Sequence, residues 1–319
     1  QFDRVFDPLQ RARIQALCSL LPGTFASADL REAGPQVLSV EYAFSTWGMP
    51  ALTASEWAAL PKLKAVFYAA GSVKGFAEPL LARGVHVISA AAANAEPVAE
   101  FTLAQILLAG KNFLRASAAL KARGPEAWQE PDCPGNYGTQ VALLGAGQVG
   151  RRVAELLKPF KLEILVFDPF LSAEDATRLG VDRVTLSEAF QRGHVVSNHL
   201  ADVPETRGML NEALFRSMPR DASFINTGRG ATVDEAGLWR ALTARPDLNA
   251  VLDVTDPEPP LPGGAAFSLP NVFLSPHLAG SLKSEVGRMA SLVVDECESL
   301  LQGRPLRHEV SLSMLKTMA

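Results

Sequence analysis

The sequence has no apolar run long enough to cross a membrane and no large excess of either charge. No stretch reaches the roughly 18 consecutive apolar residues that a membrane helix needs. The 30 basic and 34 acidic residues give a formal net charge of −4, which lacks the strong positive field typical of nucleic-acid-binding proteins. We therefore expect neither a membrane nor a nucleic acid as partner.

Cysteine is also scarce. The 3 cysteines, Cys18, Cys133 and Cys297, are scattered, and no Cys-x-x-Cys pair occurs. This spacing supports neither a disulfide framework nor a cysteine-rich zinc site, so we expect no metal. Because no signal-peptide pattern opens the chain, we expect a cytoplasmic location. The first residue is Gln1, and we expect the numbering to omit a short natural N-terminus.

What is present is the composition of a globular protein. Hydrophobic residues make up 48% and charged residues 20% of the 319 residues. At roughly 150 residues per domain, this length predicts two domains. The chain carries two series of short apolar strands that alternate with helical patterns. Such alternation predicts an α/β fold with two Rossmann-like domains and mostly parallel sheets.

The pattern also places the individual elements. In the first series, strands are predicted at 37–40, 65–68 and 85–88. A long helix is predicted from about Pro97 to Ala122, because proline suits the first turn of a helix. In the second series, strands are predicted at 141–145, 162–168, 195–200, 222–227, 250–254 and 272–275. The last predicted helix, 284–303, would return to the first domain.

A glycine-rich turn follows the first strand of the second series. Its G-x-G-x-x-G spacing is formed by Gly145, Gly147 and Gly150, with Gln148 and Val149 between the last two. The three glycines permit, in order, a tight turn, a close approach of the backbone to a pyrophosphate, and close packing of helix on strand. This turn predicts a dinucleotide site.

Asp168 lies at the end of the next predicted strand, 18 residues beyond Gly150. Its carboxylate can accept hydrogen bonds from both adenosine ribose hydroxyls and would repel a 2′-phosphate. The position therefore predicts NAD rather than NADP as cofactor. The alternative interpretation is a structural turn followed by a solvated aspartate.

Reactive side chains follow three later predicted strands. Arg229 comes after strand 222–227, Asp253 and Glu258 lie at and beyond the end of strand 250–254, and His277 follows strand 272–275. The carboxyl ends of parallel strands share one edge of the sheet, so we expect these groups to converge. Arginine can hold a carboxylate, histidine can protonate an alkoxide, and a carboxylate can orient the imidazole. Singly, each residue is more typical of a structural or surface position. Together they predict hydride transfer to a 2-oxo acid.

At this point the chain resembles a known family. Residues from about Val37 to Val310 are similar to the D-isomer-specific 2-hydroxyacid dehydrogenases. The similar stretches are 69–76, 94–109, 143–154, 195–210, 224–238, 252–259 and 275–281. The resemblance implies an NAD-dependent, homodimeric enzyme that reduces 2-oxo acids to D-2-hydroxy acids. It also implies that an NAD-binding domain of residues 98–287 is inserted into a split, flavodoxin-like substrate domain of residues 1–97 and 288–319.

The resemblance further implies roles for individual residues. Arg229 would bind the substrate, His277 would be the acid/base, and Glu258 would be its carboxylate partner. Thr227 and Asp253 would line the nicotinamide side, and Gly228 would also bind the cofactor. His199 either lines the nicotinamide pocket or is structural. The N–H groups of Gly71, Ser72 and Val73 would hold the substrate carboxylate, as consecutive N–H groups in a turn can do.

Two other functions and one question of specificity stay open. A corepressor-like protein of the same fold would use NAD as a structural or sensing ligand. Formate or phosphite oxidation is less favoured, because formate-oxidising relatives carry glutamine where Glu258 stands. Specificity is assigned to the loop containing Trp47 and Met49 and to Lys74, which either binds a second anionic group or points to solvent. The physiological acid is not identified.

Overall fold

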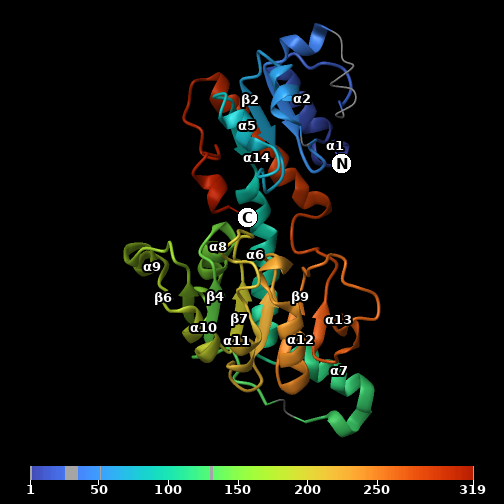
Figure 1. Cartoon of the computed structure of the whole chain (residues 1–319), viewed down its shortest axis with the longest axis vertical. Helices are drawn as coiled ribbons and strands as arrows, with labels where there is room; N and C mark the ends of the chain where they lie inside the picture. The colour runs from blue at the N-terminus through green and yellow to red at the C-terminus, as the bar shows by residue number, and fades with distance from the viewer. Residues whose placement is uncertain (1, 26–34, 51, 130–131, 319) are drawn as a thin grey trace. The chain divides into compact units, whose positions relative to one another are not determined.

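The computed structural model describes residues 2–25, 35–50, 52–129 and 132–318. The chain forms two compact units (Figure 1). Unit 1 comprises residues 1–94 and 281–318, and unit 2 comprises residues 95–280. Unit 2 is thus inserted between the two segments of unit 1. Within the described ranges, no helix is both long and apolar enough to span a membrane.

Unit 1 is built on a three-stranded parallel sheet in the order β1-β2-β3. The strands are β1 (Tyr42–Ser45), β2 (Ala65–Tyr68) and β3 (His86–Ser89). The helices are α1 (Phe2–Val5), α2 (Pro8–Leu17), α4 (Ala54–Ala58), α5 (Ala77–Leu81) and α14 (Val286–Leu301), with short 3-10 turns at η4 (Lys283–Glu285) and η5 (Met314–Lys316). Central strand β2 is buried on both faces, as strands of a covered parallel sheet are.

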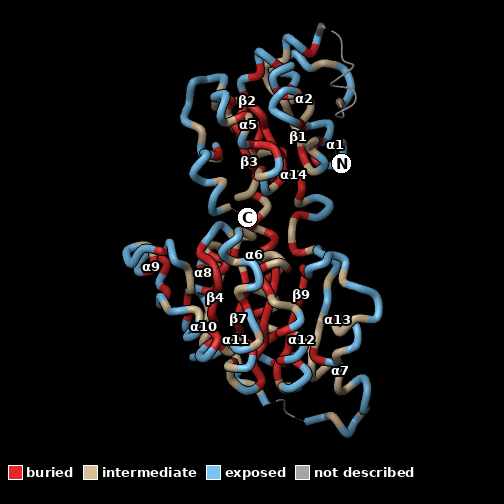
Figure 2. Tube along the Cα trace, in the orientation of Figure 1, coloured by how far each residue is buried: buried red, intermediate tan, exposed pale blue. Residues whose placement is uncertain are grey.

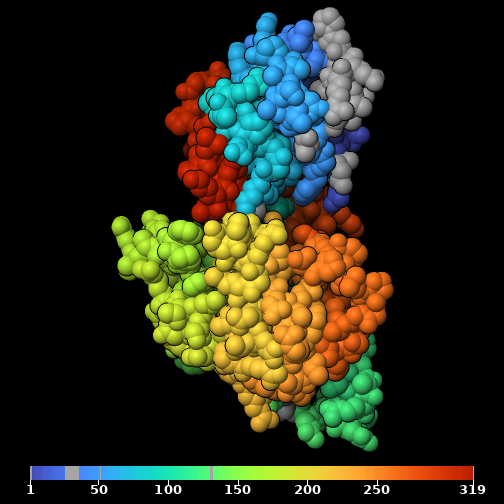
Figure 3. All heavy atoms as spheres, viewed as in Figure 1, coloured from blue at the N-terminus to red at the C-terminus, as the bar shows by residue number. Residues whose placement is uncertain are grey.

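Alternate residues of β2 enter two apolar clusters. Phe67 packs with α2 and α14 on one face, where Met289 and Val293 are fully buried. Val66 packs on the other face with Trp57 of α4 and with α5. The C-terminal segment then runs antiparallel to β3 at an isolated bridge, where the Val310 N–H donates to the Val87 carbonyl at 2.8 Å. In Figure 3 this segment, coloured red, lies beside atoms coloured cyan in the same unit.

One predicted strand of this unit is wrong. Residues 37–40 do not form a strand; Pro35–Ser39 is a 3-10 turn, η1, and the strand begins at Tyr42. A four-residue apolar run does not distinguish strand from helix by its period, and Pro35 at its start favours a turn. Within the run, Val37 is buried but Leu38 is exposed, so it lacks the burial of an inner strand.

Unit 2 has a seven-stranded, all-parallel sheet in the order β10-β9-β8-β7-β4-β5-β6. Its strands are β4 (Gln140–Leu144), β5 (Glu163–Phe167), β6 (Asp182–Arg183), β7 (Val195–Asn198), β8 (Ser223–Asn226), β9 (Asn249–Leu252) and β10 (Val272–Leu274). The order reverses between β4 and β7, which is where ligands bind in open α/β sheets. The predicted fold class is confirmed.

Helices cover both faces of this sheet. One face packs on α6 (Ala91–Ala109), α8 (Gln148–Leu157) and α9 (Ala173–Leu179). The other packs on α10 (Leu186–Arg192), α11 (Glu212–Arg216) and α12 (Glu235–Ala244). The remaining elements are α7 (Phe113–Arg123), η2 (Gly124–Ala127), η3 (Gly230–Thr232) and α13 (Ala265–Ser268).

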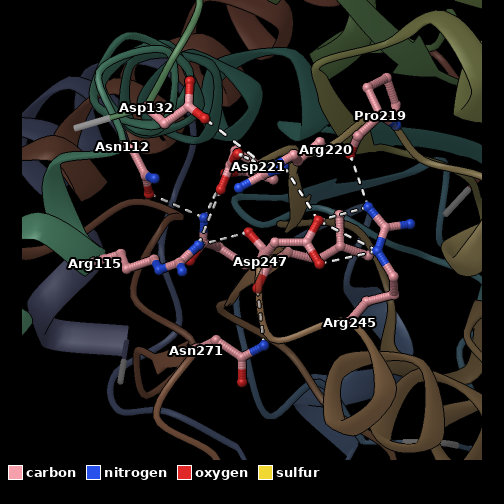
Figure 4. Close-up of polar contacts among 12 residues, drawn as sticks. Asn112, Arg115, Asp132, Pro219, Arg220, Asp221, Arg245, Asp247 and Asn271 are labelled. Atoms are coloured by element: carbon pink, nitrogen blue, oxygen red, sulfur yellow. Dashed lines mark hydrogen bonds and ion pairs between the residues drawn. The ribbon is translucent and has the colours of Figure 1, made fainter.

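The long predicted helix starts and ends differently in the structure. Helix α6 begins six residues before Pro97, which therefore lies inside the helix instead of in its first turn. A left-handed residue, Asn112 (φ 48°), separates α6 from α7. No residue of α7 is buried, and Figures 1 and 2 show it standing away from the sheet of unit 2. A polar network fixes its base, where Asn112 accepts from Asn249 at 3.1 Å and Arg115 donates to Asp221 at 3.2 Å (Figure 4).

Candidate functional site

The glycine-rich turn joins β4 to α8 at the point where the strand order reverses. Gly145 has φ +97°, and a Cβ there would lie 2.9 Å from the His199 carbonyl oxygen. A Cβ on Gly150 would lie 2.0 Å from the Gly145 carbonyl oxygen. At Gly147, the residue before α8, a Cβ would meet no atom within 4 Å. Two of the glycines are therefore needed for packing, and the middle one leaves open space at the start of α8.

Asp168 follows β5 and reaches back to this turn. Its Oδ2 accepts the Ala146 N–H at 2.6 Å, and its Oδ1 accepts the Phe170 N–H at 2.7 Å. A carboxylate offers about four acceptor sites, so each oxygen keeps one for a further donor. Asp168, which the sequence predicts to bind the ribose, is thus anchored against the glycine-rich turn and keeps acceptor capacity for two hydroxyls.

His199 and Thr227 lie at the ends of neighbouring strands. The Thr227 hydroxyl is 3.4 Å from His199 Nδ1 and 3.1 Å from the Thr102 hydroxyl on α6. Ser197 Oγ lies 3.0 Å from His199 Nε2. Burial lowers the pKa of His199 to about 4, so the imidazole is neutral at neutral pH. Gly228 is also closely packed, since a Cβ there would lie 3.0 Å from the Asn198 carbonyl oxygen.

The lowered pKa of His199 has a consequence for stability. An ordinary histidine in the unfolded chain binds a proton near pH 6.5, whereas folded His199 binds one only near pH 4. Stability from this residue is therefore lost as pH falls below 6.5. Relative to His199→Gln, wild type should lose about 2 kcal/mol in unfolding free energy between pH 7 and pH 5. Urea unfolding of wild type and His199→Gln at pH 7 and at pH 5 measures the difference between their unfolding free energies. The same difference at both pH values would contradict the burial of His199.

Arg229 lies just beyond β8 and is largely buried. Its Nη1 donates to the Gly228 carbonyl at 2.8 Å. Burial lowers the pKa of Arg229, and the neighbouring carboxylates of Asp202 and Glu258 only partly offset that effect. A buried guanidinium has several donors in a rigid fork and favours an added anion, which would complete its compensation.

His277 and Glu258 meet on loops that follow β10 and β9. His277 Nδ1 lies 2.6 Å from Glu258 Oε1, and the two side chains are 51% and 43% exposed. A carboxylate can only accept, so the Nδ1 hydrogen lies between them and Nε2 remains for exchange with a ligand. His277 itself has a left-handed backbone (φ 49°), which non-glycine residues adopt only when the surroundings hold them.

Asp253 holds the His277 loop. Its carboxylate accepts the Ser275 hydroxyl at 2.6 Å and the N–H groups of Leu278 and Ala279 at 2.9 Å each. Its backbone carbonyl accepts the His277 N–H at 3.0 Å. Asp253 is only 4% exposed, so these contacts on both sides of His277 fix the loop. This anchoring role was missed in the sequence, where Asp253 is placed only on the nicotinamide side.

The predicted anion nest lies in unit 1, after β2. The Gly71 carbonyl accepts the Ser89 hydroxyl at 2.6 Å, which fixes the turn. Across the described ranges, no protein group accepts a hydrogen bond from the N–H groups of Gly71, Ser72 and Val73. Consecutive N–H groups without protein acceptors suit a carboxylate or another small anion.

The residues assigned to specificity are also in unit 1. Trp47 and Met49 pack against its apolar clusters and line a cavity of about 790 Å³ along edge strand β1. Lys74 is partly buried. In the part of the chain that the structure describes, no three His, Cys, Asp or Glu side chains are grouped to hold a metal ion.

A parallel sheet that reverses its strand order beside a glycine-rich turn is the architecture of dinucleotide-binding domains. A family model described as the NAD-binding domain of D-isomer specific 2-hydroxyacid dehydrogenases matches residues 103–279. The chain belongs to the D-isomer specific 2-hydroxyacid dehydrogenase family. The predicted family and cofactor are confirmed, and the open, uncrowded turn at Gly147 fits NAD's pyrophosphate.

Two relatives match similar shares of this chain but differ in how much of their own length is covered. It is 30% identical over 256 residues to a glyoxylate reductase of Korarchaeum cryptofilum, covering 79% of this chain and 77% of that one. It is 29% identical over 236 residues to the D-3-phosphoglycerate dehydrogenase of Archaeoglobus fulgidus, covering 73% of this chain but only 44% of that one. The chain thus spans less than half the length of that relative.

The fold is shared with a D-mandelate dehydrogenase of Rhodotorula graminis. The apo crystal structure superposes with a TM-score of 0.82 over 95% of this chain and 93% of that one, at 22% sequence identity.

Proposed function

We propose that this chain reduces 2-oxo acids to D-2-hydroxy acids with NADH. The observation that carries the proposal is the 2.6 Å contact of His277 Nδ1 with Glu258, on the strand-end edge that also holds Arg229 and the glycine-rich turn. An acid–base pair, a buried cation and a dinucleotide site are the groups that this reaction requires.

The chain's own residues divide the work between substrate binding and proton transfer. When bound, the reduced nicotinamide supplies a hydride to the carbonyl carbon of the substrate. Arg229 binds the substrate carboxylate and the keto oxygen, where negative charge develops. Imidazolium at His277 gives its Nε2 proton to that oxygen, while ionised Glu258 holds the Nδ1 hydrogen and stabilises the charged ring. Gly71, Ser72 and Val73 offer N–H groups for a carboxylate.

A substrate panel tests the proposal. Glyoxylate, hydroxypyruvate, phosphohydroxypyruvate, pyruvate and bulky 2-oxo acids are each supplied with NADH, and then with NADPH, and absorbance of the reduced cofactor is followed. Turnover of at least one acid, with a D-configured product on chiral chromatography, is expected. NADH binding without turnover of any acid would instead favour the corepressor-like function, in which NAD is a sensing ligand.

Asp168 should set the preference for NADH over NADPH. Asp168→Ala combined with Pro169→Arg removes the ribose acceptor and its charge and adds a cation. We expect the ratio of kcat/KM for NADH to that for NADPH to fall about 10–100-fold, since a charged hydrogen bond contributes about 1.5–3 kcal/mol. Glu174→Ala, a nearby exposed carboxylate, should leave the ratio unchanged. Wild type using both cofactors equally well would contradict this assignment.

We also propose that the chain forms a homodimer through the α7–η2 arm. The arm has no buried residue in α7, yet Phe113 at the start of α7 and Trp128 directly after η2 are 50% and 79% exposed. Large apolar side chains on a projecting segment are typical of a protein interface. Light scattering should give twice the chain mass, and Trp128→Ser should weaken association while Phe267→Ser, on α13, should not.

The expected location is the cytoplasm, where the free thiols would stay reduced.

A further inference from the structure

Glu235 lies at the first position of α12. That helix start does not use its side chain. Asp234 is the capping residue, and its Oδ1 accepts the Gly237 N–H at 3.0 Å. The Glu235 carboxylate points elsewhere and accepts the N–H of Asp256 at 2.8 Å. Within the described part of the chain, the hydrogen bond of the Glu235 side chain therefore joins α12 to another segment.

The partner of Glu235 is two residues before Glu258. A second hydrogen bond holds this loop, because the Thr255 hydroxyl donates to the Pro257 carbonyl at 2.9 Å. Thr255 is buried, whereas Asp256 and Glu258 are exposed. The hydrogen bond to Glu235 thus fixes the backbone at Asp256, two residues before the exposed Glu258 carboxylate.

The segment that carries Arg229 packs against the loop that carries Glu258. Gly230, the next residue, lies so close to the Glu258 loop that a Cβ there would be 2.1 Å from the Thr255 carbonyl carbon and 2.6 Å from the Asp256 nitrogen. Backbone packing brings the two segments together but has no directional bond of its own. The Glu235 carboxylate supplies that bond, because α12 continues from the segment that carries Arg229.

We propose that Glu235 is a positioning residue that fastens the segment following Arg229 to the segment preceding Glu258, and so holds Glu258 within reach of His277. The 2.6 Å contact between Glu258 and His277 tolerates little displacement, because hydrogen bonds weaken steeply with distance and angle. This proposal rests on the proposed function, since it assigns Glu235 to the same acid–base pair.

The environment of Glu235 agrees with a role in binding a backbone N–H. Burial raises the pKa of its carboxyl group; the hydrogen bond from the Asp256 backbone opposes this, and the charge of Asp256 adds to it. A glutamine at this position retains an oxygen acceptor without the cost of burying a charge. Glu235→Gln should therefore keep the contact, whereas Glu235→Ala removes it and Glu235→Asp is too short by one methylene.

The first test is kinetic. Glu235→Ala and Glu235→Asp should each lower kcat about 10–100-fold, as a displacement of about 1 Å in a catalytic group can do. KM for NADH should be unchanged, and Glu235→Gln should retain wild-type kcat within about twofold. Glu188→Ala is the matched control, because Glu188 also accepts a backbone N–H at a helix start, that of Thr185 at 2.8 Å on α10; it should leave kcat unchanged. A Glu235→Gln variant as slow as Glu235→Ala would overturn the proposal.

The second test does not depend on activity. Hydrogen exchange of the Asp256 amide, followed by mass spectrometry of the unliganded protein, should be faster in Glu235→Ala and Glu235→Asp than in wild type. Glu235→Gln should exchange at the wild-type rate. If wild type reduces no 2-oxo acid, the proposed function fails, yet the exchange rates still report on the contact. Equal exchange in all four proteins would overturn the role of Glu235 whatever the activity.

Discussion

Replacing His277 with alanine should lower kcat for 2-oxo acid reduction about 10²–10⁴-fold, the usual range for loss of a general acid. The alkoxide formed by hydride addition would then have to take its proton from water. The dissociation constant for NADH, measured by fluorescence titration, should stay at the wild-type value, because no contact joins His277 to the glycine-rich turn or Asp168 within the described residues. Fast turnover in this variant would remove His277 from the reaction.

Glu258→Gln should have a smaller effect than loss of His277. The amide oxygen can still accept the Nδ1 hydrogen, but the charge that favours imidazolium is gone. Replacing a charged by a neutral hydrogen bond costs about 1–1.5 kcal/mol, or about tenfold in kcat. Glu258→Ala, which removes the acceptor as well, should be slower than Glu258→Gln.

Unit 1 provides a matched control for this pair. His86 Nδ1 lies 2.6 Å from Glu309 Oε1, with side chains 42% and 41% exposed. Length and exposure are nearly those of the His277–Glu258 pair, but His86 is at the start of β3, away from the strand ends of that sheet. Glu309→Gln should therefore leave kcat unchanged. An equal loss in Glu309→Gln and Glu258→Gln would mean that neither reports on proton transfer.

Sequence pattern located the candidate site residues best where each one follows a strand or a tight turn at a fixed place on the sheet. The steric contacts at Gly145 and Gly150 leave no room for another residue, so their spacing carries the signal. Arg229 and His277 follow apolar strands, and strand ends can be located from pattern alone. Convergence of these groups followed from the parallel sheet, without knowledge of side-chain geometry.

Sequence pattern did not predict hydrogen bonds between segments that are far apart in the chain. The Asp253 side chain binds residues more than 20 positions away, and Glu235 binds an N–H 21 positions away. The sequence placed Asp253 only on the nicotinamide side and did not single out Glu235. The error at 37–40 is of another kind, since a short apolar run carries no period and its neighbours decide its conformation. Pro97 stays in a helix because the surrounding alanine-rich sequence favours one.

Arg229 and Arg245 differ in whether a carboxylate is bonded to the guanidinium. Arg245 lies after α12, where it pairs with Asp247 at 2.6 Å and donates to three backbone carbonyls, including that of Pro219 at 3.3 Å (Figure 4). The hydrogen bonds that Arg245 donates to the Asp247 carboxylate raise its pKa. The pKa of Arg229 is instead lowered by burial. Arg245 is thus paired with the Asp247 carboxylate, whereas within the described residues no carboxylate is bonded to Arg229.

Arg229→Lys keeps the charge but loses the planar fork that binds a carboxylate and a keto oxygen together. We expect kcat/KM for the 2-oxo acid to fall about 10–100-fold, equivalent to losing a charged hydrogen bond of about 1.5–3 kcal/mol. Arg245→Lys is the matched control, since it should lower the urea midpoint of unfolding and leave kcat/KM unchanged. Among the described residues, the Arg229 side chain makes one hydrogen bond to the protein, to the Gly228 carbonyl. Arg229→Lys should therefore change the urea midpoint little and lower kcat/KM. Kinetics and urea unfolding of both variants separate the two roles. If Arg229→Lys keeps wild-type kcat/KM, the buried guanidinium does not bind the substrate, and its lowered pKa reflects packing alone.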